Sequence, residues 1–184
     1  MEFMDDPEME YEDDPDFVDR SYAVPSMSDL ALQPEVEGVA RFIELPSFDP
    51  ERIYTVVYRS GWLEISAVVG MRSLWDSLSQ HEPFDPGNAS RQSVTLALSS
   101  PKCPPLLRSW PSLRTASADA GPCWTPSFDG IGYWHRLADR EYCSDAKWHN
   151  PYSSSPQSAL IEAYVELLRG VGLYPEQSSN REHG

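Results

Sequence analysis

Residues 130–170, GIGYWHRLADREYCSDAKWHNPYSSSPQSALIEAYVELLRG, contain the clearest structural signals in this chain of 184 residues. Residues 130–137 alternate well enough for a strand, and residues 143–148 return as its partner after the charged turn at 139–141. Pro151 ends the second strand, because proline cannot donate a hydrogen bond to a sheet. The segment therefore predicts an antiparallel hairpin.

A helix is predicted directly after this hairpin. Ser155 is a good N-cap, and Pro156 suits the first helical position. The apolar residues that follow form one broad stripe: Leu160, Ile161, Tyr164, Val165, Leu167 and Leu168. We expect a helix over about 156–169, with Gly170 or Gly172 as its C-cap.

Regular structure upstream is expected to begin with residues 53–58, which are rich in β-branched and aromatic side chains. A link that ends in glycine joins them to a second such run at 62–69, which indicates another hairpin. The spacing of apolar residues predicts a short helix at 71–78 and a strand at 93–98. A brief helix after residue 104 is expected to be shortened or kinked by Pro111.

These elements predict an α+β fold with a mainly antiparallel sheet of about five strands and the C-terminal helix packed on one face. We expect three regions. Residues 1–20 form an acidic tail that is disordered or is ordered by a partner, residues 21–175 form one α+β domain, and residues 176–184 form a flexible C-terminal tail.

The charge of the chain favours a basic partner. It has 14 Lys and Arg against 29 Asp and Glu, for a formal net charge of −15. Such a chain repels polyphosphates, so a generic nucleic-acid-binding protein is excluded. Ten acidic residues against one arginine give residues 1–20 a charge of −9. We expect this segment either to keep the protein in solution or to become ordered on a basic surface. We also expect that deletion of residues 1–20 leaves the thermal midpoint of unfolding almost unchanged.

The sequence also bears on the compartment. It contains no apolar stretch near the roughly 18 residues that would span a bilayer, and its first residues lack the pattern of a signal peptide. We therefore expect a cytoplasmic protein that does not bind membranes. Its cysteines, Cys103, Cys123 and Cys143, are expected to stay reduced.

The common catalytic and cofactor signatures are absent: there is no glycine-rich phosphate loop, H-E-x-x-H, C-x-x-C or G-x-S-x-G. We therefore assign no catalytic residue, metal ligand or cofactor, and expect no enzyme. One alternative stays open. His135 and His149 come from the two strands of the C-terminal hairpin, and with a carboxylate they could form the centre of a small metal-dependent or acid/base hydrolase.

Residues 104–170 resemble a loosely defined group of small uncharacterised bacterial proteins, some of which are similar to immunity proteins of toxin systems. The matching features are Leu106-Leu107-x-x-Trp110, Phe128-Asp129-Gly130-x-x-Tyr133, Trp148-His149-Asn150-Pro151 and the apolar pattern of residues 159–168. The acidic N-terminal segment is not part of this pattern. The resemblance implies no catalytic residue.

The chain has 6 Trp, 9 Tyr and 6 Phe, and Trp and Tyr often anchor protein interfaces. Charge, this aromatic content and the resemblance together favour an immunity-type inhibitor, which binds and blocks a basic toxin enzyme. A non-enzymatic adaptor or structural subunit is a further alternative. The residues expected to bind the partner are acidic, aromatic or imidazole side chains of the tail and the C-terminal hairpin: Asp13, Asp14, Asp16, Asp129, Tyr133, Trp134, His135 and His149.

Overall fold

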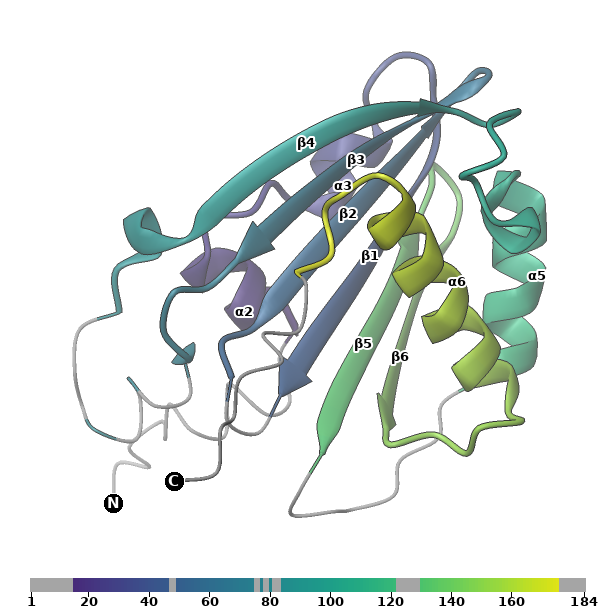
Figure 1. Cartoon of the computed structure of the whole chain (residues 1–184). Coiled ribbons are helices and arrows are strands. Elements are labelled where there is room, and N and C mark those ends of the chain that lie inside the picture. The colour runs from purple at the N-terminus through teal and green to yellow at the C-terminus, as the bar shows by residue number, and fades with distance from the viewer. Residues whose placement is uncertain are drawn as a thin grey trace, which may run out of the picture.

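The computed structural model shows a six-stranded antiparallel sheet in the order β4-β3-β2-β1-β5-β6, with helices on both faces (Figure 1). It describes residues 15–46, 49–74, 77, 80, 84–121 and 130–175. The predicted α+β class and antiparallel sheet are confirmed. The sheet has one strand more than expected, and helices cover its second face as well.

The additional strand is β1 (Val36–Pro46), which lies in the middle of the sheet and pairs with both β2 and β5. We expected regular structure to begin only at residue 53. Both faces of β1 are covered, so almost every side chain is buried and the alternation that identifies a strand is missing. The buried charged residues Arg41 and Glu44 hide the strand further.

Both predicted hairpins are present. β2 (Arg52–Arg59) turns into β3 (Trp62–Val69) through Gly61, whose φ of 83° suits glycine. β5 (Ile131–Ala138) pairs with β6 (Cys143–His149) at the other edge of the sheet.

β4 (Ser90–Ala97) follows a short 3-10 turn, η1 (Pro86–Asn88), and pairs with β3 along its whole length. The strand predicted at 93–98 is therefore confirmed, although it begins earlier. Of the helix predicted at 71–78, Leu74 and Ser77 are helical, and part of the remainder lies outside the described residues.

One face of the sheet is covered by α5 (Trp110–Ala120) and α6 (Pro156–Gly170), which follow a 3-10 turn, η2 (Pro105–Leu107). The predicted helix α6 is confirmed with Ser155 as its N-cap, but Gly170 is its last residue and Val171, not a glycine, is its C-cap. Pro111 does not shorten α5; it lies in the first turn, where a missing N–H leaves no hydrogen bond unmade.

The main core lies between this face and the two helices. Its largest buried members from the sheet and helices include Phe42, Tyr54, Tyr58, Leu107, Trp148, Tyr164, Leu167 and Leu168. Full burial of each such leucine stabilises the fold by about 1.5–3 kcal/mol, because its apolar surface leaves water.

The opposite face is covered by α2 (Pro15–Ser21) and α3 (Met27–Ala31), neither of which the sequence predicted. Val18 of α2 is fully buried, in a cluster with Ile43 and Trp134. Residues 15–20 are therefore a packed helix, and the boundary of the expected tail at residue 20 is wrong. Residues 1–14 and 176–184 lie outside the described residues.

No helix in the described ranges is long and apolar enough to cross a membrane. Cys103 is buried and Cys143 is exposed, and both are free thiols. Cys123 lies in the gap between residues 121 and 130 and is not described.

Candidate partner-binding site

The two histidines of the C-terminal hairpin lie on opposite faces of the sheet. His135 is paired with Ala146, whereas His149 is paired with Gly132. Residues directly opposite each other share a face, and successive residues of a strand alternate between faces. His135 therefore faces α5 and α6, and His149 lies on the face of Trp134. The expected histidine pair does not form, because the sheet separates the two rings.

His135 lies in the core. It is 1% exposed, its Nδ1 lies 3.2 Å from the Ser117 hydroxyl, and its Nε2 lies 2.9 Å from the Tyr164 hydroxyl. Its ring also stacks on Trp148, at 5.4 Å between centres. Burial lowers the pKa of His135 to about 3, so the imidazole is neutral at physiological pH and links α5, β5 and α6.

The two aromatic residues expected to contact a partner also pack inward. Trp134 is 2% exposed in the cluster beneath α2, with the Lys147 ammonium 5.2 Å from its ring centre. Tyr133 is half-buried, and its ring stacks on Phe42 at 5.6 Å. Burial raises the pKa of Tyr133 to about 12. Both side chains belong mainly to the packing of the domain.

Of the four aspartates expected to bind a partner, only Asp16 is described. It is exposed on α2 and forms an ion pair with Arg136 at 2.8 Å. Asp13, Asp14 and Asp129 lie outside the described residues. Those of the expected residues that the structure describes therefore do not gather on one surface.

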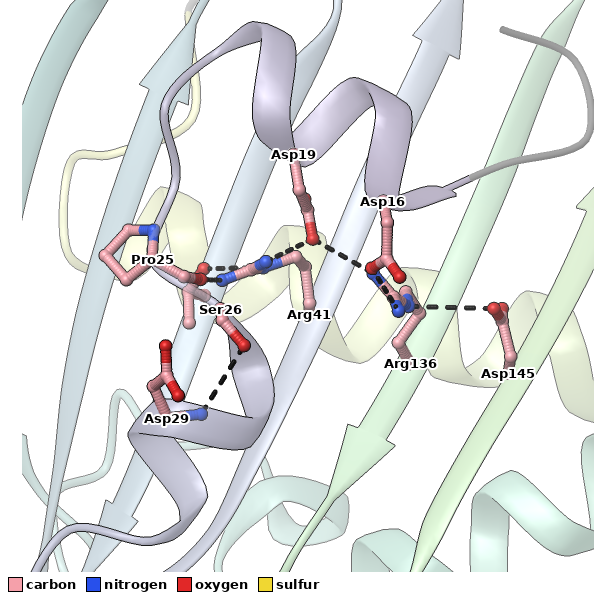
Figure 2. A network of polar contacts seen from close by, with 9 residues as sticks. Asp16, Asp19, Pro25, Ser26, Asp29, Arg41, Arg136 and Asp145 are labelled. Atoms are coloured by element: carbon pink, nitrogen blue, oxygen red, sulfur yellow. Dashed lines mark hydrogen bonds and ion pairs between the residues drawn. The ribbon is translucent and has the colours of Figure 1, made fainter. Parts of the chain in front are cut away.

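An ionic network fastens α2 to the sheet (Figure 2). Asp19 of α2 accepts hydrogen bonds from Arg41 of β1 and, at 2.9 Å, from Arg136 of β5. Arg41 also donates to the Pro25 carbonyl at 2.7 Å and to the Thr55 hydroxyl at 3.1 Å. Arg41 is completely buried, so its donors are satisfied by the protein and not by water.

Burial acts against the charges of this pair. It raises the pKa of Asp19 and lowers that of Arg41, and the attraction between the two side chains opposes both shifts. Such a pair adds little net stability, but it becomes very unfavourable when one member is removed. The buried Arg41 therefore requires a carboxylate at this position, and Asp19 of the acidic segment supplies it.

A surface hollow of about 560 Å³ lies at the end of the sheet where β1 begins and where β2 turns into β3 and β5 into β6. Its lining comes from these turns and from α5: Glu35, Val36, Glu37, Ser60, Trp110, Arg114, Asp139, Arg140 and Glu141. We call it the acidic groove, because four carboxylates and two guanidinium groups line it.

Asp139 joins the walls of the acidic groove. One of its oxygens accepts the Glu141 and Tyr142 amides, at 2.9 and 2.8 Å, and the other accepts the Trp110 indole N–H at 2.9 Å and Arg114 at 3.1 Å. Burial opposes ionisation of Asp139, but these hydrogen bonds and the charge of Arg114 lower its pKa. Asp139 therefore holds the turn and α5 together as a permanent anion.

The rim of the acidic groove is open to solvent. Glu35, Glu37 and Glu141 are exposed, whereas the floor residue Trp110 is 5% exposed and lies against Gly38. Glu35 has a φ of 65°, an uncommon conformation for a residue other than glycine. Arg140 is also exposed on the rim, where the three glutamates outnumber it. The groove therefore combines a fixed aromatic floor with a rim of net negative charge, which suits a cationic side chain.

Sequence analysis missed the acidic groove. Asp139 and Glu141 were interpreted only as turn residues, and Glu35 and Glu37 precede a strand that was not recognised. Four separate segments build the groove, so no local pattern identifies it. The Trp110 motif is the one signal that points toward it.

Comparison with known proteins finds no match: no protein-family model, curated protein or solved structure matches this chain. The function is therefore argued from the geometry and charge of the chain itself.

Proposed function

We propose that this protein is an immunity-type inhibitor, which binds a basic bacterial toxin enzyme and blocks it. The acidic groove is the observation that carries the proposal. It places Glu35, Glu37 and Glu141 around a fixed tryptophan, in a chain whose net charge is −15. Arginine or lysine side chains of the partner would enter the groove and pair with the rim carboxylates.

The fixed geometry supports this role. Asp139 holds Trp110 and the turn that carries Glu141, so the groove needs little ordering when a partner binds. Preformed sites lose less conformational entropy on binding than flexible ones. Trp110, the floor of the groove, is also part of the Leu106-Leu107-x-x-Trp110 pattern on which the resemblance to small bacterial proteins rests, and this supports the immunity-type function.

The hydrolase alternative has lost its structural basis, because His135 and His149 lie on opposite faces of the sheet. Among the described residues, no group of three or more histidine, cysteine or acidic side chains is arranged to hold a metal ion. The adaptor alternative shares the binding surface of the inhibitor and differs only in whether the partner is an enzyme.

The test uses the product of the gene beside this one as the partner and compares two triple variants of equal charge. Glu35→Gln, Glu37→Gln and Glu141→Gln remove the rim of the acidic groove. The control, Asp119→Asn, Glu162→Gln and Glu166→Gln, removes three exposed carboxylates of α5 and α6. Both lose the same long-range charge, so association should slow equally.

Dissociation separates the two variants, because only contacts within the interface hold a complex together. We expect the groove variant to dissociate at least about tenfold faster, which corresponds to roughly 1.4 kcal/mol, and to lose inhibition of the partner's enzymatic activity. The control should dissociate like the unmodified protein. Equal dissociation of both variants, or an acidic partner, would overturn the proposed site.

A further inference from the structure

β4 is an open edge of the sheet. Within the part of the chain that the structure describes, it pairs with β3 alone, and the Leu98 amide donates to the Gly61 carbonyl at 3.0 Å. Because alternate residues of a strand direct their backbone groups to opposite sides, this bond fixes which residues point outward. They are the odd-numbered ones, Arg91, Ser93, Thr95 and Ala97, and all four are exposed.

Apart from the charge of Arg91, this edge lacks the features that normally prevent strands from pairing. β4 contains no proline and no lysine, and its register with β3 runs without a bulge from Ser90 to Ala97. The opposite edge strand, β6, carries the charged residues Asp145 and Lys147. β4 therefore offers eight residues of regular backbone to a further strand.

We propose that β4 pairs antiparallel with β4 of a second copy of this chain, about a twofold axis at Val94. In this register Ser93 of each copy faces Thr95 of the other, and Arg91 faces Ala97. These are the outward-directed residues, so they form the hydrogen-bonded pairs of the new ladder. Val94 meets its own counterpart in a close pair without hydrogen bonds, which covers a half-exposed apolar side chain.

The charges of β4 favour a second copy of this chain as the source of the pairing strand. Arg91 is the one charged residue of β4, and its guanidinium donates to the Tyr22 carbonyl at 2.5 Å. In the Val94 register this arginine faces an alanine, so no like charges meet. A basic partner would gain nothing from a strand whose one charge is positive. β4 itself contains no carboxylate, so the paired strands add no contact between negative charges to two chains of −15.

The pairing can be tested on the protein alone, by measuring its mass in solution over a range of concentrations. Thr95→Pro removes an N–H that points away from β3, so it should leave the fold intact and block the new ladder. Thr95→Ala keeps that N–H and is the matched control. We expect twice the chain mass of 20.8 kDa for the unmodified protein and for Thr95→Ala, and a fall to the mass of one chain for Thr95→Pro.

A charge pair tests the register and does not depend on proline. Ser93→Lys with Thr95→Lys places like charges opposite each other and should give single chains. Ser93→Glu with Thr95→Lys places opposite charges across the twofold axis and should restore the dimer.

A single-chain mass for the unmodified protein at high concentration, or a dimer that survives Thr95→Pro, would overturn the proposal. It would also be overturned if Thr95→Pro instead abolished binding of the basic partner, since β4 would then pair with a strand of that partner. The result does not depend on whether the inhibitor function is right, because no toxin enters the mass measurement.

Discussion

The two faces of the sheet are held by different physical means. The face beneath α5 and α6 is packed with aromatic and aliphatic side chains, and even its histidine is neutral. The face beneath α2 and α3 combines smaller apolar clusters with the buried pair of Arg41 and Asp19. Stability of the first face should depend little on salt and charge, whereas attachment of α2 depends on charge complementarity.

The largest expected effect is at Asp19. Asp19→Asn leaves the fully buried Arg41 without its counter-ion and should lower the free energy of unfolding by about 3–5 kcal/mol. Asp16→Asn is the matched control on the same helix, because Asp16 is exposed and its ion pair with Arg136 lies at the surface. It should change stability by less than about 1 kcal/mol.

Urea denaturation of both variants measures this difference. If the two variants lost the same free energy of unfolding, burial would not determine how much these ion pairs contribute to stability. Deletion of residues 1–20 should likewise destabilise the protein, in contrast to what the sequence alone predicted, because it removes Asp19 and the buried Val18.

The next effect concerns the apolar face. A Cβ at Gly38 would lie 2.1 Å from the Trp110 ring, so Gly38→Ala forces the indole away from β1 and from Asp139. Overpacking of this kind lowers stability by about 1–3 kcal/mol. At the control position Gly132, also in a strand, the added atom would lie 3.6 Å from its nearest neighbour, an ordinary contact.

Thermal or urea unfolding of Gly38→Ala and Gly132→Ala, each at low and high salt, tests the contrast between the faces. The loss for Gly38→Ala should be the same at both salt concentrations, since no charge is changed. A loss that disappears at high salt would contradict the description of this face as apolar packing.

Sequence reasoning succeeded where a segment has one buried face. β5, β6 and α6 show the expected periodicity. Ser155 marks the start of α6, and Gly61 marks the turn between β2 and β3. It failed at β1, whose two buried faces remove the alternation, and at α2, whose acidic residues are typical of a tail. What makes α2 a helix on the sheet is Arg41 and Arg136, which are distant in the sequence.

The candidate site shows the same division. The expected partner-binding residues came from one hairpin and the tail, and His135, Trp134 and Tyr133 all serve packing to a large extent. The acidic groove depends on how three turns and α5 meet, which is a property of strand order. Strand order could not be predicted while β1, the strand between the two hairpins, was missing.

His135 gives the apolar face one dependence on pH. Its pKa is about 3 in the fold, below the usual 6.5, so between these values the unfolded chain binds more protons than the folded one. This contribution to stability is complete above pH 6.5 and is lost as the pH falls toward 3. Between pH 8 and pH 5.5 it should lower the free energy of unfolding by about 1.4 kcal/mol.

Comparison with His135→Gln isolates this contribution. Glutamine does not titrate and can still bond Ser117 and Tyr164. Its free energy of unfolding should fall by about 1.4 kcal/mol less over the same interval. Buried carboxylates such as Asp19 and Glu44, whose pKa values burial raises, act in the opposite direction in both proteins and cancel in the difference. Identical pH profiles would mean that His135 is not a buried neutral imidazole.

The smallest expected effect is at Asp145, which shares Arg136 with Asp19. Its carboxylate lies 3.6 Å from the Arg136 Nε, and its side chain is 46% exposed, against 8% for Asp19. Water already solvates an exposed carboxylate, so Asp145→Asn should lower the free energy of unfolding by no more than about 0.5 kcal/mol. High salt should remove this difference, because mobile ions screen exposed charges, while the loss for Asp19→Asn persists. Both aspartates contact the same guanidinium and differ mainly in how exposed they are. Denaturation of the two variants at low and high salt therefore shows how burial changes the contribution of an ion pair to stability. The opposite result would be that Asp145→Asn lowers the free energy of unfolding as much as Asp19→Asn does, or that its loss is equally insensitive to salt. Either result would show that all the carboxylates around Arg136 contribute alike and that the buried contact beneath α2 has no special weight.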